Sequence, residues 1–279
     1  MHRLVIQAPN IATQDLKQLA RLSDAYQIDA INQQAFRLLG AHIDNDEAVA
    51  DFCESNQLDY AFIPEDANVH DIGLVVMDMD STLITIECID EIADMVGIKP
   101  QVADITAAAM RGELDFRESL TRRVALLAGL EESALARVYD ERLQLMAGAE
   151  KMLKGFQQAG AKTLLISGGF TFFTGKLQTR LSLSRAIANV LEIDNGKLTG
   201  KVNGDIVDAE RKKTELIAFR EELGLRRDQV VAIGDGANDL PMLHEAGYGV
   251  ACHAKPKVKA EAPYSINQVG LEGVLNYFL

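Results

Sequence analysis

Residues 73–90, GLVVMDMDSTLITIECID, carry the chain from a short apolar run into two aspartates, Asp78 and Asp80, that stand one residue apart. A buried carboxylate is destabilising unless a cation or hydrogen-bond donors compensate it. The stretch therefore predicts one of two things. Either a strand ends in two solvated acids, or the strand end holds something positive.

Three later apolar runs are of the same kind: 161–167 (AKTLLIS), 228–235 (DQVVAIGD) and 247–252 (GYGVAC). Helical stretches separate them. Apolar runs of this type with helices between them are typical of a parallel sheet that is covered on both faces. We predict an α/β fold with a Rossmann-like parallel sheet.

Two insertions interrupt the predicted sheet. About eighty residues between the first two runs show helical patterns only, which predicts a helical cap inserted at about 86–147. A second insertion, 190–208 (VLEIDNGKLTGKVNGDIVD), holds the turn pairs Asn195-Gly196 and Asn203-Gly204 between alternating residues. These pairs predict hairpins.

The first 70 residues follow a different rhythm. Residues 2–8 and 59–64 indicate strands, 13–26 and 46–56 indicate helices, and 35–43 fits either a strand or a helix. We therefore expect a small α+β module over 1–70, with a possible regulatory role, and a catalytic domain over 71–279. The ligand of the module and the formation of a homodimer stay open.

The composition excludes several classes of function. The 279 residues carry a formal net charge of −13, which argues against a nucleic-acid-binding surface. The three cysteines are far apart in the sequence, so we expect neither a zinc site nor a disulfide framework. This cysteine usage fits the reducing cytoplasm. No stretch has the pattern of a signal peptide or a membrane span. We expect a cytoplasmic protein that does not associate with membranes.

Polar turns follow three of the predicted strands: 78–82 (DMDST), 167–169 (SGG) and 234–239 (GDGAND). Each turn alone is a weak signal. In an open parallel sheet, however, ligands bind outside the carboxyl ends of the strands. The three turns together, with Lys212 ahead of the third, predict a single site.

With these motifs, residues 74–256 resemble the haloacid dehalogenase-like phosphohydrolases, and within them the bacterial phosphoserine phosphatases. The N-terminal module resembles the regulatory extensions of such enzymes only loosely. The resemblance implies a hydrolase that converts O-phospho-L-serine to L-serine and phosphate, the last step of serine biosynthesis.

The resemblance also implies roles for the aspartates. Asp78 would be the nucleophile that forms an aspartyl-phosphate, and Asp80 the general acid and base. Carboxylate attack on a phosphate dianion needs a cation, and Mg²⁺ prefers oxygen ligands. Asp78, Asp235 and the main-chain carbonyl of Asp80 would bind Mg²⁺, whereas Asp239 would support this shell or hold Lys212.

The phosphate would be held by Ser167, the amide of Gly168 at the start of the following helix, Lys212 and Asn238. Spacing alone does not separate Lys212 from Lys213. The resemblance favours Lys212, which lies 23 residues before Asp235.

The resemblance implies that Glu87 binds the ammonium of the substrate and that Arg123 binds its carboxylate. Arg122 competes with Arg123, which stands directly before the apolar VALL and matches the family position. Met110 and Phe116 fit either apolar closure of a lid or the packing of cap helices.

Two other functions stay open at this point. One is a phosphatase or phosphotransferase for another small ester, such as phosphohomoserine. The other is a catalytically silent amino-acid sensor, although the intact set Asp78, Asp80, Lys212 and Asp235 argues against it.

Overall fold

Two β-sheets organise the chain, and the computed structural model describes all residues 1–279. The larger sheet has seven strands in the order β11-β10-β9-β5-β6-β7-β8. The pairs β9–β10, β10–β11 and β6–β7 are parallel, and β7–β8 is antiparallel. Its strands are β5 (Leu74–Met77), β6 (Lys162–Phe170), β7 (Arg185–Asp194), β8 (Lys197–Asn203), β9 (Val230–Gly234), β10 (Tyr248–Cys252) and β11 (Tyr264–Ile266). The prediction of an α/β fold with a mostly parallel sheet is confirmed.

The chain divides into two units, which are described separately. The first comprises Met1–Val75, Ala147–Lys162 and Arg220–Leu279, and the second comprises Val76–Met146 and Thr163–Phe219. The predicted division into 1–70 and 71–279 stays a prediction.

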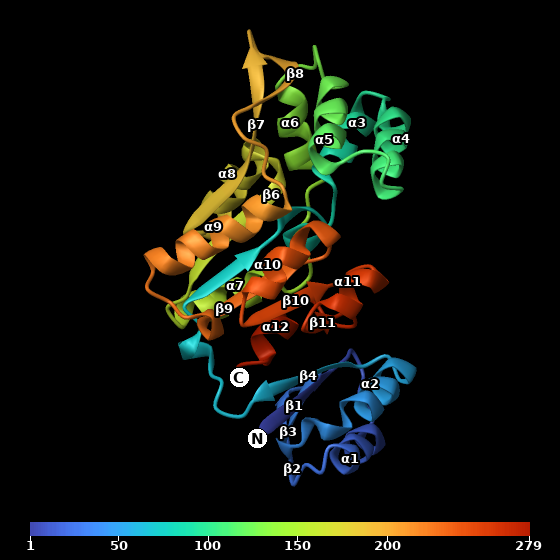
Figure 1. Ribbon diagram of the computed structural model, residues 1–279, viewed down its shortest axis with the longest axis vertical. Helices are drawn as coiled ribbons and strands as arrows, with labels where there is room; N and C mark the ends of the chain where they lie inside the picture. The colour runs from blue at the N-terminus through green and yellow to red at the C-terminus, as the bar shows by residue number, and fades with distance from the viewer. The chain divides into compact units, whose positions relative to one another are not determined.

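In the first unit, the N-terminal module forms a separate sheet of order β2-β3-β1-β4. Helices α1 and α2 cover one face of it (Figure 1). Its elements are β1 (His2–Gln7), α1 (Thr13–Leu22), β2 (Gln27–Asn32), β3 (Ala35–Ala41), α2 (Asp46–Ser55) and β4 (Asp59–Pro64). The ambiguous segment 35–43 is thus largely a strand. Strand β2 was not predicted, because its sequence QIDAIN gives only a weak apolar signal. None of its residues is buried in the structure.

The two faces of β1 have different partners because side chains alternate along a strand. Leu4 and Ile6 join the core with α1 and α2. On the opposite face, Arg3 donates to the carbonyl oxygen of Tyr277 at 2.6 Å. The Gln7 side chain donates to Gly273 O at 3.0 Å and accepts from Asn276 Nδ2 at 2.7 Å. Buried hydrogen bonds therefore join the module to the C-terminal segment.

The rest of the first unit surrounds strands β9–β11. Helix α10 packs on β9 and β10, and α12 packs on α7. The helices are α7 (Ala149–Gln158), α10 (Leu240–Glu245), α11 (Pro256–Glu261) and α12 (Glu272–Asn276). No helix of the structure combines the length and the apolar character that a membrane crossing requires.

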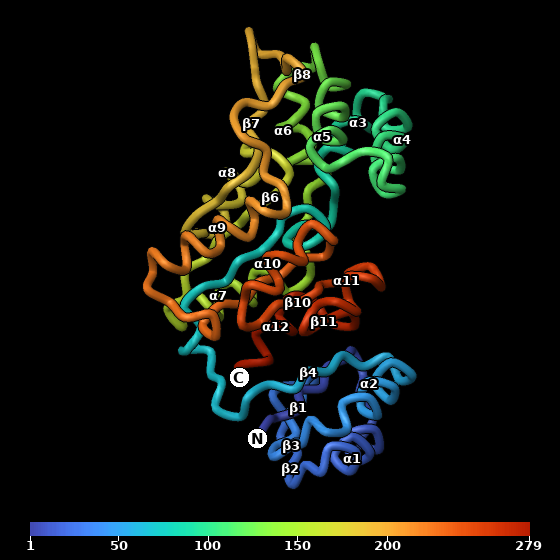
Figure 2. The backbone as a smooth tube through the Cα atoms, viewed as in Figure 1, coloured from blue at the N-terminus to red at the C-terminus, as the bar shows by residue number.

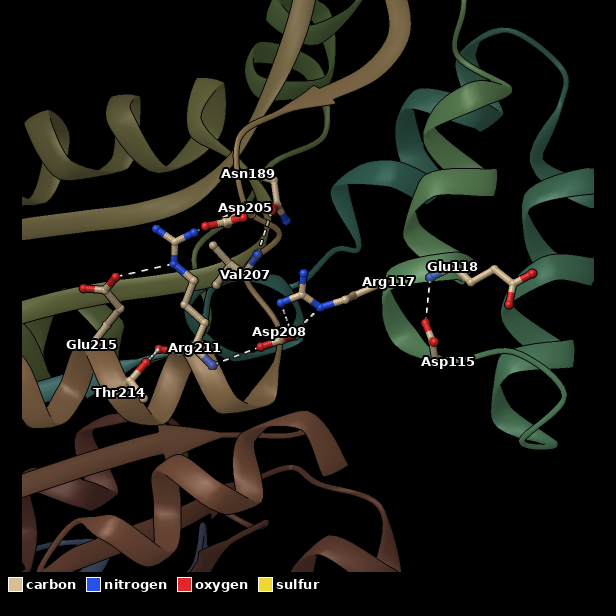
Figure 3. A network of polar contacts seen from close by, with 10 residues as sticks. All are labelled: Asp115, Arg117, Glu118, Asn189, Asp205, Val207, Asp208, Arg211, Thr214 and Glu215. Atoms are coloured by element: carbon tan, nitrogen blue, oxygen red, sulfur yellow. Dashed lines mark hydrogen bonds and ion pairs between the residues drawn. The ribbon is translucent and has the colours of Figure 1, made fainter.

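The second unit contains the predicted helical insertion, green in Figure 2. Its helices are α3 (Cys88–Met95), α4 (Lys99–Met110), α5 (Phe116–Ala125) and α6 (Ser133–Glu141), and further along the chain come α8 (Thr171–Leu181) and α9 (Ala209–Glu222). Arg117 of α5 pairs with Asp208, just before α9, at 2.6 Å (Figure 3). This ion pair links the inserted helices to the start of α9.

The second predicted hairpin is wrong. Asn195-Gly196 does turn β7 into β8, with both residues at positive φ. Asn203 instead ends β8, and the chain continues from Gly204 into α9 without another strand. Residues 205–208, between Gly204 and α9, are too few for a strand, and no strand pairs with them.

Candidate active site

Asp78 and Asp80 leave the end of β5 on an extended backbone, with φ/ψ of −72°/164° and −64°/133°. Met79 between them is fully buried, and Asp78 is 6% exposed. The chain then turns sharply at Ser81, whose φ is +55°. This turn ends the extended segment directly after the second aspartate.

Lys212, in the first turn of α9, lies on Asp78. Its Nζ is 2.8 Å from Asp78 Oδ1, and the two side chains are 1% and 9% exposed. Asp208 holds this helix start, since its Oδ1 accepts from the amide of Arg211 at 3.0 Å. A buried ion pair depends on both partners, because either charge alone would be strongly destabilising. The structure thereby separates Lys212 from the partly exposed Lys213.

The surroundings of Asp80 favour its neutral form. Burial, followed by the nearby charge of Glu87, raises the pKa of Asp80 to about 7. The amide of Cys88 donates to Asp80 Oδ1 at 3.0 Å and acts in the opposite direction. A carboxyl group with such a pKa can both release and accept a proton near neutral pH.

Ser167, Gly168 and Gly169 do not lie at a helix start, as was predicted, but inside β6. The strand continues to Phe170, and its register against β7 shifts between Ile166 and Phe170, which makes the three residues a bulge. A Cβ atom on Gly169 would lie 2.7 Å from Asp80 Oδ2, so the bulge packs directly against that carboxyl group.

Glu87 and Arg123 face the same region of the second unit. Ser81 Oγ donates to Glu87 Oε1 at 2.8 Å. Burial lowers the pKa of the Arg123 guanidinium, whereas the charges of Asp90, Glu87 and Asp80 act in the opposite direction. Arg123 is therefore in electrostatic range of both Glu87 and Asp80.

Arg122 points elsewhere. It is exposed and pairs with Glu118, one turn earlier on α5, at 2.5 Å. Phe116 approaches the bulge, since a Cβ atom on Gly168 would lie 2.8 Å from its Cζ. Met110 is 68% exposed, so it does not belong to the helix-packing core that was one of its two interpretations.

The loop after β9 is folded by Asp239. Its Oδ2 accepts from the amides of Asp235 at 3.1 Å and Gly236 at 3.0 Å. Asn238 is partly exposed beside them. Carboxylate oxygens of Asp235 and Asp239 lie within 4.8 Å of one another. Such an all-oxygen set of donors fits a hard divalent cation.

Asn189 was not predicted as a site residue. It is a fully buried residue of β7 whose side-chain amide bonds to the Ser167–Gly169 bulge. The signal was a single polar residue inside the apolar run AIANVL, which a strand pattern alone does not distinguish from a surface position.

Comparisons with known proteins identify the family of the chain. The family model of haloacid dehalogenase-like hydrolases matches residues 72–247, and a model of a domain of unknown function, DUF4072, matches residues 4–49. The chain is 49% identical to a phosphoserine phosphatase of Polaromonas over 215 residues, which is 75% of this chain and 91% of that protein.

Two solved structures are also similar. A haloacid dehalogenase family hydrolase from Salmonella enterica superposes with a TM-score of 0.92 at 33% identity and covers 100% of this chain and 99% of its own. A phospho-aspartyl intermediate analogue of phosphoserine phosphatase superposes with a TM-score of 0.70 at 36% identity and covers 75% of this chain and 99% of its own. The chain belongs to the haloacid dehalogenase-like hydrolases, in the group that contains the bacterial phosphoserine phosphatases.

Proposed function

We infer that the chain hydrolyses O-phospho-L-serine to L-serine and phosphate through an aspartyl-phosphate, as the last step of serine biosynthesis. The observation that carries the proposal is the buried pair of Asp78 and Lys212 next to Asp80 at the end of β5. The 49% identity to a phosphoserine phosphatase and the likeness to the phospho-aspartyl analogue support it.

In the first half-reaction, a carboxylate oxygen of Asp78 forms a bond to phosphorus while the bond from phosphorus to the serine oxygen breaks. Asp80 transfers its proton to the departing serine oxygen. The positive charge of Lys212, 2.8 Å from Asp78, stabilises the negative charge on the phosphoryl group as it is transferred to Asp78. The products of this step are serine and the phosphorylated Asp78.

In the second half-reaction, Asp80 accepts a proton from a water molecule that attacks phosphorus. The acyl-phosphate bond then breaks, which restores the Asp78 carboxylate and releases phosphate. A pKa of about 7 suits Asp80 to both steps, because it is the acid in one and the base in the other.

We propose that the phosphate oxygens are held by the hydroxyl of Ser167, the amide of Gly168, Lys212 and Asn238. Glu87 and Arg123 bind the ammonium and the carboxylate of the substrate. The location of Arg123 in range of Glu87 and Asp80 supports its assignment, and the surface ion pair of Arg122 speaks against the alternative.

We propose Mg²⁺ as the metal, held by Asp78, Asp235 and the main-chain carbonyl of Asp80. When bound, it offsets the repulsion between the attacking carboxylate and the phosphate dianion. The carboxylate cluster and its oxygen donors fit this ion. The Asp239 carboxylate accepts hydrogen bonds from two backbone amides of its own loop, which supports a role in holding Asp235 in place.

We further propose that 71–279 is the catalytic domain with a cap at about 86–147, and that 1–70 is an attached module. The separate sheet and core of the module support this division. The buried cysteines without disulfides support a cytoplasmic location.

Phosphate release tests the proposal. The full chain, incubated with Mg²⁺, is assayed on O-phosphoserine, phosphohomoserine and p-nitrophenyl phosphate, with and without an added alcohol acceptor. We expect the highest kcat/KM on O-phosphoserine, with water as the acceptor. A higher value on another ester, or transfer to the alcohol in place of hydrolysis, would overturn it.

A further inference from the structure

Asn189 fills a gap in the hydrogen bonding of the sheet. The bulge Ser167–Gly169 interrupts the ladder between β6 and β7, and Asn189 stands opposite Phe170, where pairing resumes. Its Nδ2 donates to the carbonyl oxygen of Gly168 at 2.7 Å. The side chain of Asn189 thus supplies to the bulged strand a donor that the regular ladder does not provide.

This bond controls the direction of one peptide group. The carbonyl of Gly168 and the amide of Gly169 belong to the same planar unit and point in opposite directions. Between two glycines, such a unit is only weakly restrained by its own side chains. With its carbonyl held by Asn189, the amide of Gly169 donates to Ser167 Oγ at 2.8 Å.

The contact with Gly169 orients the hydroxyl of Ser167. Ser167 is fully buried, and its oxygen accepts the Gly169 amide, which leaves its proton to be donated to another acceptor. The arrangement therefore prepares this hydroxyl as a donor before substrate arrives. Preorganised donors of this kind stabilise charge at a reacting centre without a later rearrangement.

The other end of the Asn189 side chain contacts the segment just before α9, the helix that carries Lys212. Its Oδ1 accepts from the amide of Val207 at 2.8 Å (Figure 3). The next residue, Asp208, accepts from the amide of Arg211, and its carbonyl accepts from the amide of Lys212 at 2.9 Å. One buried amide thus ties the serine bulge to the helix start that carries Lys212.

We propose that Asn189 is a positioning residue for the phosphate-binding groups, which acts through the Gly168–Gly169 peptide on the hydroxyl of Ser167. This inference rests on the proposed role of Ser167 in holding phosphate. It predicts that a change of Asn189 lowers the rate on every phosphate ester alike, because its side chain bonds to Gly168 and Val207 and not to Glu87 or Arg123.

A double-mutant cycle tests the proposal. Asn189→Asp keeps the size and an acceptor for Val207 but removes the donor to Gly168. We expect kcat/KM to fall about tenfold or more on both O-phosphoserine and p-nitrophenyl phosphate, the factor expected for one lost buried hydrogen bond. In a Ser167→Ala background, the same change should cost less than about threefold.

The matched control is Asn203→Asp, the same change on the exposed end of β8, which should leave both rates within about twofold. Thermal unfolding of each variant shows whether it is folded, and Asn189→Ala replaces Asn189→Asp if the buried carboxylate prevents folding. Equal losses from the Asn189 change with and without Ser167 would overturn the inference alone. A wild-type rate in Ser167→Ala would overturn the role of Ser167 and the inference with it.

Discussion

Arg123→Ala should separate recognition of the serine part from phosphate chemistry. Loss of one partner of a closed, charged hydrogen-bonding pair costs about 2–5 kcal/mol. Arg123 is only partly buried, so we take the lower part of this range, about 2–3 kcal/mol, which lowers kcat/KM for O-phosphoserine roughly 30- to 160-fold. On p-nitrophenyl phosphate, which lacks both the ammonium and the carboxylate, the loss should stay within a few-fold.

Arg122→Ala is the matched control, one residue away on the same helix. Its exposed pair with Glu118 at i and i+4 contributes only about 0.3–0.5 kcal/mol to stability. The change should therefore leave the helix in place and alter kcat/KM by about twofold at most on either ester. Steady-state phosphate release for both variants and both esters gives the comparison.

Two results would refute this reasoning. Equal losses on the two esters in Arg123→Ala would mean that Arg123 shapes the cap or the phosphate site. Equal losses in Arg122→Ala and Arg123→Ala would mean that the wrong arginine had been chosen.

Three further predictions concern the chemistry and the stability of the chain. Asp78→Asn, nearly identical in shape, should abolish phosphate release while circular dichroism stays unchanged, and substantial turnover would refute the assignment of the nucleophile. Excess EDTA should abolish activity and added Mg²⁺ should restore it, since the carboxylate cluster otherwise repels the phosphate; full activity in EDTA would contradict the metal proposal. Asp59→Ala should lower the free energy of unfolding by about 2–4 kcal/mol, because the buried Asp59 carboxylate accepts three backbone amides of the loop 267–269. Urea unfolding measures this loss, and the exposed Asp66→Ala should stay within about 0.5 kcal/mol of the wild type.

Strands β5, β6, β9 and β10 of the larger sheet could be predicted because each is a short apolar run that ends in polar residues. Asp78 and Asp80 were predicted to be site residues for the same reason: carboxylates directly after a buried run need a compensating partner. Local sequence is sufficient for such features, since the apolar run and the polar turn are neighbours in the chain.

Other features depended on contacts between residues that are distant in the sequence. Neighbours on a helix point about 100° apart, so two adjacent lysines or arginines have different surroundings. Only the packing of α9 and α5 decided that Lys212 meets Asp78 and that Arg122 pairs on the surface. The burial of Arg3 in the N-terminal module, against a carbonyl 274 residues away, was beyond any local pattern.

The bulge in β6 likewise depends partly on local sequence and partly on contacts with a distant segment. The sequence SGG by itself determined that the backbone there is free of bulky side chains, and so predicted a turn. The pairing with β7 decided that the three residues stay in the strand as a bulge, and that Asn189 supplies the donor for Gly168. Strand register is a property of two segments together, so neither sequence alone contains it.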